Sequence, residues 1–268
     1  IGTICMPARD TYYLFTKNEI ELADTIASQI AAAVDNAKLH AKTESELGVA
    51  ERDLEIGRQI QSGFFPETLP EISGWEIATH FHAARQVAGD FYDVFQFRNS
   101  TFTAFIIADV CDKGVGAALF MVLFRSLLRA FSEIKINTDN VQEQLLNIIM
   151  NTNNFIAEYH GKSNMFATMF FGVLDPDTGI MSYVNGGHEP PIILDKHGSV
   201  IQRLMPTGPA VGMFPEMNFR VEQVHLAEGD FMFGFTDGVT DARNMAGQQF
   251  SEARLLKSIA APWTSIFS

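Results

Sequence analysis

VAGDFYDVF at residues 87–95 and IIADVCDKGVGAALF at residues 106–120 are the stretches that decide the fold of this chain. Phe91–Phe97 alternates large apolar and polar residues, and Thr103–Val110 is a denser apolar run. Both patterns predict β-strands, which a short turn would join as a hairpin. Lys113–Gly116 is rich in glycine and precedes a long apolar stretch, so we expect a loop followed by a helix.

Two aspartates mark the ends of these predicted strands. Asp90 lies at the start of the first strand and Asp109 at the end of its antiparallel neighbour, so a hairpin brings both carboxylates to one place. Taken alone, an aspartate beside a glycine most often belongs to a turn. A third strand pattern, Phe231–Thr236, also ends at an aspartate followed by glycine, Asp237. Carboxylates gathered in this way suit hard divalent cations such as Mg²⁺ or Mn²⁺.

Four motifs follow one another along the chain: AGDFYD at 88–93, ADVCDKGVGAAL at 108–119, NGGH at 185–188 and TDGVTDA at 236–242. Together they resemble SpoIIE-type serine/threonine phosphatases, the bacterial branch of the metal-dependent PPM (protein phosphatase 2C-like) family. The resemblance covers a predicted domain at residues 65–268. It implies an α+β fold, an α/β/β/α sandwich of two antiparallel sheets flanked by helices. The strand and helix patterns agree with that fold, and Trp75–Phe81 is predicted to be its first strand.

The resemblance also implies a site for two metal ions, Mn²⁺ or Mg²⁺. Asp109 would bridge both ions, Asp90 would hold one and Asp237 the other. The backbone carbonyl of Val110 would take a further position on one ion. The nucleophile would be a metal-bound water, so no serine or cysteine nucleophile is expected.

Four further residues are candidates for a place around such a site. Asp93 and Asp241 would bind metal-bound water, or they are solvated carboxylates of a strand and a loop. Arg85 would bind phosphate, or it forms an ordinary surface ion pair. His188 would protonate a leaving group, or it braces its loop, which we favour.

Two departures from the family pattern bear on activity. Asp112 stands where the family commonly has glycine, and it either adds negative charge near the site or adopts the same positive-φ turn. The family's final strand carries an Asp-Asp-Ile-Thr-like motif whose aspartate completes the metal site, and the sequence after Ile259 lacks it. We therefore expect weak metal affinity and low activity from this chain, and normal activity from a longer form.

The first part of the chain predicts a regulatory segment. Residues 1–18 resemble the last strand and the start of the last helix of a GAF sensor domain, with Thr16 and Glu19 at the spacing of a capping box. Residues 19–64 predict one long linker helix. Its small and apolar residues form a heptad-like stripe: Ile20, Ala23, Ala27, Ile30, Val34, Ala37 and Ala41. The helix either pairs in a parallel homodimer, which we favour, or packs on its own globular neighbours.

Composition limits the possible partners. The 268 residues carry a net charge of −13, which argues against a surface that binds nucleic acid. The two cysteines, Cys5 and Cys111, provide no disulfide framework, a pattern typical of the reducing cytosol. We expect no membrane span within this chain, because Arg125 interrupts its longest apolar helical run, Ala117–Phe124. The chain is thus predicted to be cytoplasmic.

Three functions compete at this stage. The first is a protein phosphatase regulated by its sensor through the linker helix and acting on a phosphoprotein that resembles an anti-sigma-factor antagonist. The second is a catalytically weak or inactive module that keeps the fold and binds a partner. The third, a two-metal nucleotide cyclase or phosphodiesterase, needs basic nucleotide-binding residues that the sequence does not offer. Lys113–Gly116 also lacks the spacing of a nucleotide-binding P-loop.

Overall fold

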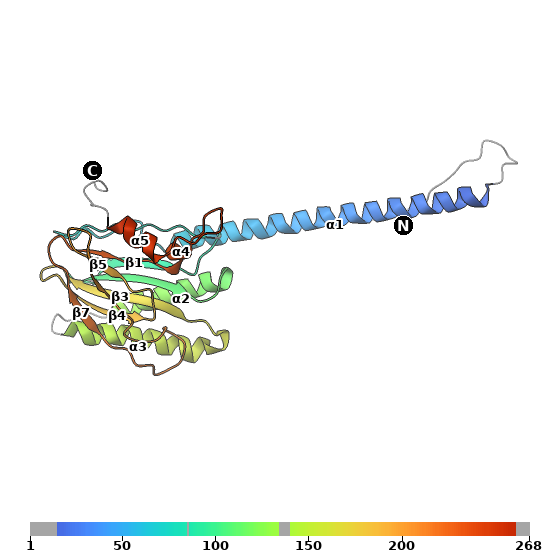
Figure 1. The fold of residues 1–268 in the computed structure, drawn as a ribbon. Helices are drawn as coiled ribbons and strands as arrows, with labels where there is room; N and C mark the ends of the chain where they lie inside the picture. Colours follow the sequence, from blue (N-terminus) through green and yellow to red (C-terminus); the bar gives the residue numbers. More distant parts are fainter. Residues whose placement is uncertain (1–14, 85, 134–139, 261–268) are drawn as a thin grey trace. The chain divides into compact units, whose positions relative to one another are not determined.

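The computed structural model describes residues 15–84, 86–133 and 140–260, and it divides the chain into the units Ile1–Ile56 and Gly57–Ser268 (Figure 1). Helix α1 (Lys17–Ser62) begins in the first unit and ends in the second. The remaining elements belong to the second unit: β1 (Phe91–Gln96), β2 (Thr103–Val110), α2 (Val115–Ser132), α3 (Val141–His160), the 3₁₀ helix η2 (Gly161–Ser163), β3 (Ala167–Asp175), β4 (Ile180–Gly186), β5 (Ile192–Leu194), β6 (Val200–Arg203), β7 (Glu222–His225), β8 (Phe231–Phe233), α4 (Asp237–Thr240) and α5 (Glu252–Ile259).

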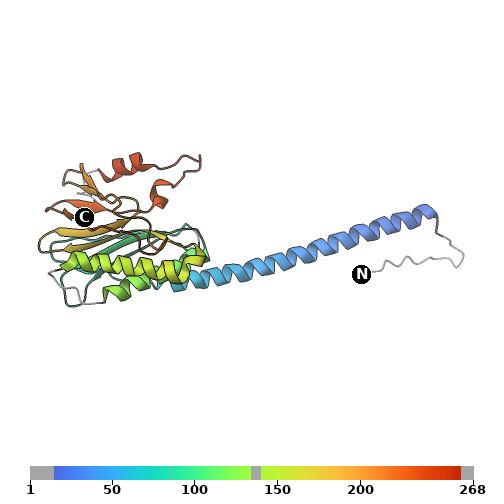
Figure 2. The same cartoon turned by 90° about the horizontal axis from the view of Figure 1, so that it is seen from below.

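The second unit contains two antiparallel sheets arranged in layers with helices. The larger sheet has the strand order β1-β2-β3-β4-β7, and the smaller has the order β6-β5-β8. Helices α2 and α3 lie along one face of the larger sheet, and Figure 2 shows α5 on the far side of the smaller sheet. The predicted fold class, two antiparallel sheets flanked by helices, is confirmed.

Alternation along β2 explains how one strand serves two hydrophobic layers. One row of β2 side chains packs into the core beneath α2 and α3: Ala104, Ile106, Ala108 and Val110. Phe105 and Ile107 point the other way, into the core between the two sheets. Because successive side chains of a strand lie on opposite faces, Asp109 continues the row of Phe105 and Ile107. Its carboxylate therefore lies on the face that is turned toward the smaller sheet.

The predicted strand Trp75–Phe81 is wrong. Within the described residues this segment makes only one isolated bridge, between Ile72 and Trp75, and adds no strand to either sheet. Its position is set by a side chain instead. The Trp75 indole Nε1–H donates to the Pro176 carbonyl at 3.1 Å, and the ring packs against the core between the sheets.

Helix α1 begins and ends within two residues of the predicted bounds 19–64. Its start has the expected reciprocal capping contacts. The Glu19 amide donates to the Thr16 hydroxyl at 3.3 Å, and the Thr16 amide donates to the Glu19 carboxylate at 2.8 Å. The large stripe residues Ile20, Ile30 and Val34 are all exposed in the single chain. Residues 1–14 of the predicted GAF remnant lie outside the described residues.

Helix α2 qualifies the prediction that no segment resembles a membrane span. By length and composition alone, Val115–Ser132 is apolar enough to cross a membrane. In the fold, however, one side of α2 packs into the core through Ala117, Met121 and Phe124. Its two arginines reach a buried carboxylate on the neighbouring sheet. Core packing thus accounts for the apolar residues on that side of α2.

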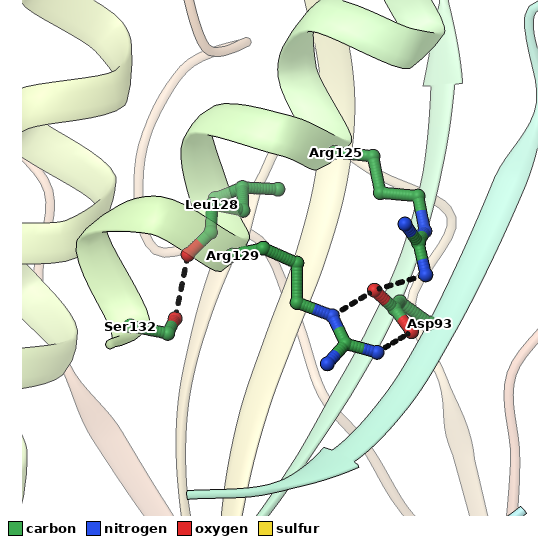
Figure 3. A network of polar contacts seen from close by, with 5 residues as sticks. All are labelled: Asp93, Arg125, Leu128, Arg129 and Ser132. Carbon is green, nitrogen blue, oxygen red and sulfur yellow. Dashed lines mark hydrogen bonds and ion pairs between the residues drawn. The ribbon is translucent and has the colours of Figure 1, made fainter. Parts of the chain in front are cut away.

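The buried carboxylate is Asp93 (Figure 3), and it corrects both alternatives for this residue, a partner of metal-bound water and a solvated strand carboxylate. Arg129 donates from Nε to Oδ2 at 2.6 Å and from Nη2 to Oδ1 at 2.7 Å. Arg125 Nη2 lies 3.1 Å from Oδ2. Asp90 and Asp93 are three positions apart along an extended segment, so their side chains lie on opposite faces of the sheet. Asp93 therefore joins β1 to α2 and faces away from the other aspartates.

We expect Asp93→Asn to destabilise the fold strongly. The substitution leaves the charge of Arg125, whose side chain is only 14% exposed, without its counter-charge. Loss of one partner from such a buried pair costs about 3 kcal/mol. Urea unfolding measures the change. The matched control is Glu133→Gln, which breaks the exposed pair with Arg98 and should cost less than about 1 kcal/mol. Equal effects of the two substitutions would contradict the structural role of Asp93.

Candidate metal centre

Three of the predicted ligands converge at the edge where the two sheets meet. Asp90 directly precedes β1, and the pairing of Phe91 with Ala108 places it opposite Asp109, the penultimate residue of β2. The two carboxyl groups share a hydrogen bond. Asp237 is the first residue of α4 and follows the last strand of the smaller sheet. Its charge acts on Asp109, so both sheets contribute a carboxylate to one cluster.

The cluster holds more negative charge than its surroundings balance. Burial, the contact with Asp90 and the charge of Asp237 together raise the pKa of Asp109 to about 7, whereas Lys113 opposes the shift. Burial also raises the pKa of Asp237, together with the charges of Asp90 and Asp241. A divalent cation would relieve this repulsion, and carboxylate oxygens are its preferred donors.

The oxygen donors of this cluster are those that a hard cation prefers. Among the described residues, no group of three or more His, Cys, Asp or Glu side chains already stands ready to hold a metal ion. Asp90, Asp109 and Asp237 would hold the ion or ions, with other donors completing the coordination. The metal roles of these residues remain predictions.

A close backbone contact places the Val110 carbonyl beside the cluster. A β-carbon built on Gly89 would lie 2.8 Å from the Val110 carbonyl oxygen and 3.1 Å from the Ala117 β-carbon. No real β-carbon tolerates the first distance, so only glycine fits between the end of β2 and the start of β1. The Val110 carbonyl thus lies against the residue that precedes Asp90, and its role as a backbone ligand stays a prediction.

Asp112 occupies the turn that a glycine would suit. Its φ is 72°, in the left-handed region, and its carboxylate Oδ1 accepts a hydrogen bond from the Lys113 amide at 2.8 Å. Aspartate tolerates this conformation better than most residues because its side chain bonds the local backbone. Of the two alternatives for Asp112, the structure supports the turn.

Of the remaining candidates, Asp241 stays near the cluster. It lies one helical turn after Asp237, and its charge helps to raise the pKa of Asp237. Its own carboxylate accepts a hydrogen bond from Gln249 Nε2 at 2.6 Å and is exposed. Asp241 therefore remains a candidate for binding metal-bound water. Arg85 lies outside the described residues.

His188 is buried, with 2% of its surface exposed, and its contacts favour bracing over acid catalysis. Its Nδ1 lies 2.9 Å from the Thr168 hydroxyl, and its backbone amide donates to Asn185 Oδ1 at 2.8 Å. Burial lowers the pKa of His188 to about 4, although the Phe235 backbone and the charge of Asp90 oppose the shift. The His188 Nε2 is buried and has no partner in hydrogen-bond geometry among the residues that the structure describes. A histidine that stays neutral near pH 7 is a poor general acid, because its remaining ring N–H is only very weakly acidic.

Two side chains that hold the cluster escaped the sequence analysis. Thr236 Oγ1 donates to Asp90 Oδ2 at 2.6 Å. Gln61, at the end of α1, pairs with the backbone of Ala88: its Nε2 donates to the carbonyl at 2.8 Å and its Oε1 accepts from the amide at 3.0 Å. Thr236 stands next to Asp237 in the motif, a signal that could have been used. The sequence offers no such signal for Gln61, because its partner is 27 residues away.

The depressed pKa of His188 predicts acid sensitivity. Unfolded chains protonate histidine near pH 6.5, whereas folded His188 stays neutral down to about pH 4. Between these values the unfolded state binds the additional proton, so stability falls by about 3 kcal/mol as the pH drops through the window. Asp109 acts in the opposite direction, because its raised pKa favours the folded state at low pH.

A comparison of variants separates the contribution of His188 to the pH dependence of stability from that of the other titrating groups. Urea unfolding of the metal-free chain at about pH 7.5 and about pH 4.5 measures the loss. His188→Gln should remove that part of the pH dependence, and the exposed control His197→Gln should retain it. If His188→Gln and wild type lose the same stability, burial does not hold His188 neutral.

Comparison with known proteins places this geometry in a family. A profile of the family described as Stage II sporulation protein E (SpoIIE) matches residues 99–265. Protein IcfG of Synechocystis sp. is 44% identical over 237 residues, 81% of this chain and 37% of that protein. Phosphoserine phosphatase RsbU of Bacillus subtilis is 27% identical over 195 residues, 73% of this chain and 55% of that protein. The chain spans less than two thirds of the length of either curated relative.

The solved structures agree on the fold. The SiaA-PP2C domain of Pseudomonas aeruginosa aligns with a TM-score of 0.62 at 17% identity, covering 80% of this chain and 82% of that one. At such low identity the likeness concerns the arrangement of sheets and helices. The match to the family profile, in contrast, extends over more than half of the 268 residues. The chain therefore belongs to the SpoIIE family and has the fold of the PP2C-type phosphatases.

Proposed function

We propose that this chain is a metal-dependent phosphatase that hydrolyses phosphoserine or phosphothreonine in a protein. The observation that carries the proposal is the convergence of Asp90, Asp109 and Asp237 from two sheets, with the pKa of Asp109 raised to about 7. The relatives support it, because two of them are named phosphoserine phosphatases, RsbU and RsbP of Bacillus subtilis. Phosphatases of this type depend on Mg²⁺ or Mn²⁺, and we propose two such ions here.

The side chains of this chain would do three things during the reaction. Asp90, Asp109 and Asp237 would hold the ions, and the Val110 carbonyl would add a neutral oxygen. The ions, when bound, supply the positive charge that activates water and neutralises the phosphoryl oxygens. Lys113 is close enough to act on the charges of Asp109 and Asp237, and it limits the negative charge that an incoming phosphate meets. His188 keeps the loop after β4 in place as a neutral side chain.

The substrate and the regulation are part of the proposal. The family resemblance favours a phosphoprotein similar to an anti-sigma-factor antagonist, in the cytoplasm. An upstream sensor would act through α1. The contact between Gln61 and Ala88 supports such a route, because the last turn of α1 thereby bonds the backbone two residues before Asp90. A displacement of that turn would shift the backbone that carries a predicted ligand.

A partner-binding module without activity is the second candidate. The absence of a ready ligand group among the described residues favours it, as does Asp112 at the position where the family commonly has glycine. The strong repulsion within the aspartate cluster opposes it. A binding surface gains nothing from a buried carboxylate whose pKa is raised to about 7, whereas a cation site does.

Hydrolysis of p-nitrophenyl phosphate with Mn²⁺ separates the two candidates. We expect Mn²⁺-dependent activity that Asp109→Asn reduces at least about 100-fold, because the substitution removes the ligand predicted to bridge both ions. Asp93→Glu is unsuitable as a control, since it disturbs a buried ion pair. Asp177→Asn, in the exposed turn between β3 and β4, is suitable.

The assay needs two forms of the protein. The family resemblance implies a final strand whose aspartate completes the metal site, so the 268-residue chain is compared with a longer form that carries this strand. We expect the longer form to be the more active. If the longer form folds and shows no Mn²⁺-dependent hydrolysis, the partner-binding module is the better description.

We also propose that α1 forms a parallel homodimer through its exposed stripe. Substitution of Ile30 and Val34 by glutamate should shift the protein toward monomer in sedimentation equilibrium, because four negative charges would then meet in the dimer interface. The matched control carries glutamate at Ala32 and Asn36, which lie on the opposite side of the helix and are also exposed. A chain that is monomeric before substitution, or equal effects of the two pairs, would refute this interface.

A further inference from the structure

We propose that Thr236 is a positioning residue for the metal centre, which orients Asp90 from the opposite sheet. Thr236 follows the smaller sheet and directly precedes Asp237, whereas Asp90 introduces the first strand of the larger sheet. Its Oγ1 lies 2.6 Å from Asp90 Oδ2, across 146 positions of sequence. The proposal rests on the proposed metal-dependent function and assigns to Thr236 a role in building the site.

The direction of the hydrogen bond decides its effect. A threonine hydroxyl has one hydrogen to donate, and an ionised carboxylate can only accept. Asp90 Oδ2 therefore receives the Thr236 hydrogen, and the rotation of the carboxyl group is fixed. The bond uses one lone pair of Oδ2, and the other lone pairs of the Asp90 carboxylate are available to a cation that takes the place of its contact with Asp109. Removal of a residue that hydrogen-bonds a metal ligand without touching the metal commonly lowers metal affinity 10–100-fold.

The surroundings of Thr236 make it a rigid donor. The preceding Phe235 is 4% exposed and packs with Leu255 and Ile259 of α5. The Thr236 carbonyl accepts a hydrogen bond from the Val239 amide at 3.1 Å, which begins the short helix α4. The chain is thus held on both sides of Thr236, by the packing of Phe235 before it and by the start of α4 after it. Because Thr236 is anchored beside the smaller sheet, its hydrogen bond ties the Asp90 side chain of the larger sheet to the smaller one.

Asp90 is restrained from two sides, and the two restraints act on different atoms. Gln61 bonds the backbone of Ala88 and so fixes the chain before Asp90. Thr236 bonds the Asp90 side chain itself. Since Asp237 is covalently attached to Thr236, one short segment both supplies a predicted ligand and orients another. The separation of Asp90 from Asp237 is therefore set by this hydrogen bond together with the packing of the sheets.

Two substitutions separate the hydroxyl from the shape of the side chain. Thr236→Val keeps the size and removes the donor, whereas Thr236→Ser keeps the donor and removes a methyl group. We expect the valine variant to bind Mn²⁺ about 10–100-fold more weakly than wild type and the serine variant to remain within about threefold. Isothermal titration calorimetry on the longer form, which carries the family's final strand, measures the Mn²⁺ affinity without reference to activity.

A third variant serves as the matched control. Thr240→Val removes a threonine hydroxyl from the same segment, where it donates to the Asp237 backbone carbonyl at 3.1 Å and not to Asp90. This variant should bind Mn²⁺ as wild type does. In the hydrolysis assay, Thr236→Val should raise the Mn²⁺ concentration needed for half-maximal rate, and saturating Mn²⁺ should restore most of the rate.

A double-variant cycle covers the case in which the valine variant is also less stable. If Thr236 acts through Asp90, adding Thr236→Val to Asp90→Asn should cause no further loss of Mn²⁺ affinity. A full additional loss in that background overturns the proposal, as does a valine variant with wild-type affinity. Wild-type protein that binds no Mn²⁺ would instead overturn the proposed function itself, so the two failures are distinguishable.

Discussion

The packing of the two sheets against each other sets the geometry on which the rest of this structure depends. Phe170 and Tyr183 stack in the larger sheet with ring centroids 5.5 Å apart, and they pack against Ile193 and Met232 of the smaller one. Asp90 and Asp109 belong to strand ends of one sheet, whereas Asp237 follows a strand of the other. The separation of the sheets therefore fixes how closely these carboxylates approach, and their repulsion is balanced by the apolar contacts beneath them.

Alternation along the first hairpin divides its charged residues between two tasks. Asp109 faces the smaller sheet, and its carboxyl group shares a hydrogen bond with that of Asp90. Asp93 faces α2 and is fully occupied by Arg125 and Arg129, with the Arg129 guanidinium 3.9 Å from the centre of the Phe95 ring. The same hairpin thus presents unbalanced negative charge on one face and a closed ion cluster on the other. The first is suited to binding a cation, and the second holds the helix layer on the sheet.

Local patterns were reliable where hydrophobic period and capping residues mark a segment. The strand Thr103–Val110, the capping box at Thr16 and the long helix α1 follow from hydrophobic period and capping chemistry. Trp75–Phe81 failed as a strand because no edge of either sheet pairs with it, which its own residues do not reveal. Asp93 was misassigned although its spacing from Asp90 was available, since an odd spacing in a strand reverses the face.

The sequence by itself determined the order of strands and helices, the family resemblance and the identity of the carboxylates, because these depend on local period and on motifs. Only the tertiary structure showed that Asp93 pairs with two arginines away from the other aspartates. The fold also brought Thr236 to Asp90 across 146 positions. It also decided the state of His188, whose pKa of about 4 results from burial between segments that are distant in sequence. The burial, electrostatic surroundings and hydrogen-bond partners of a residue depend on segments that only folding brings together, so the sequence pattern reveals them only in part.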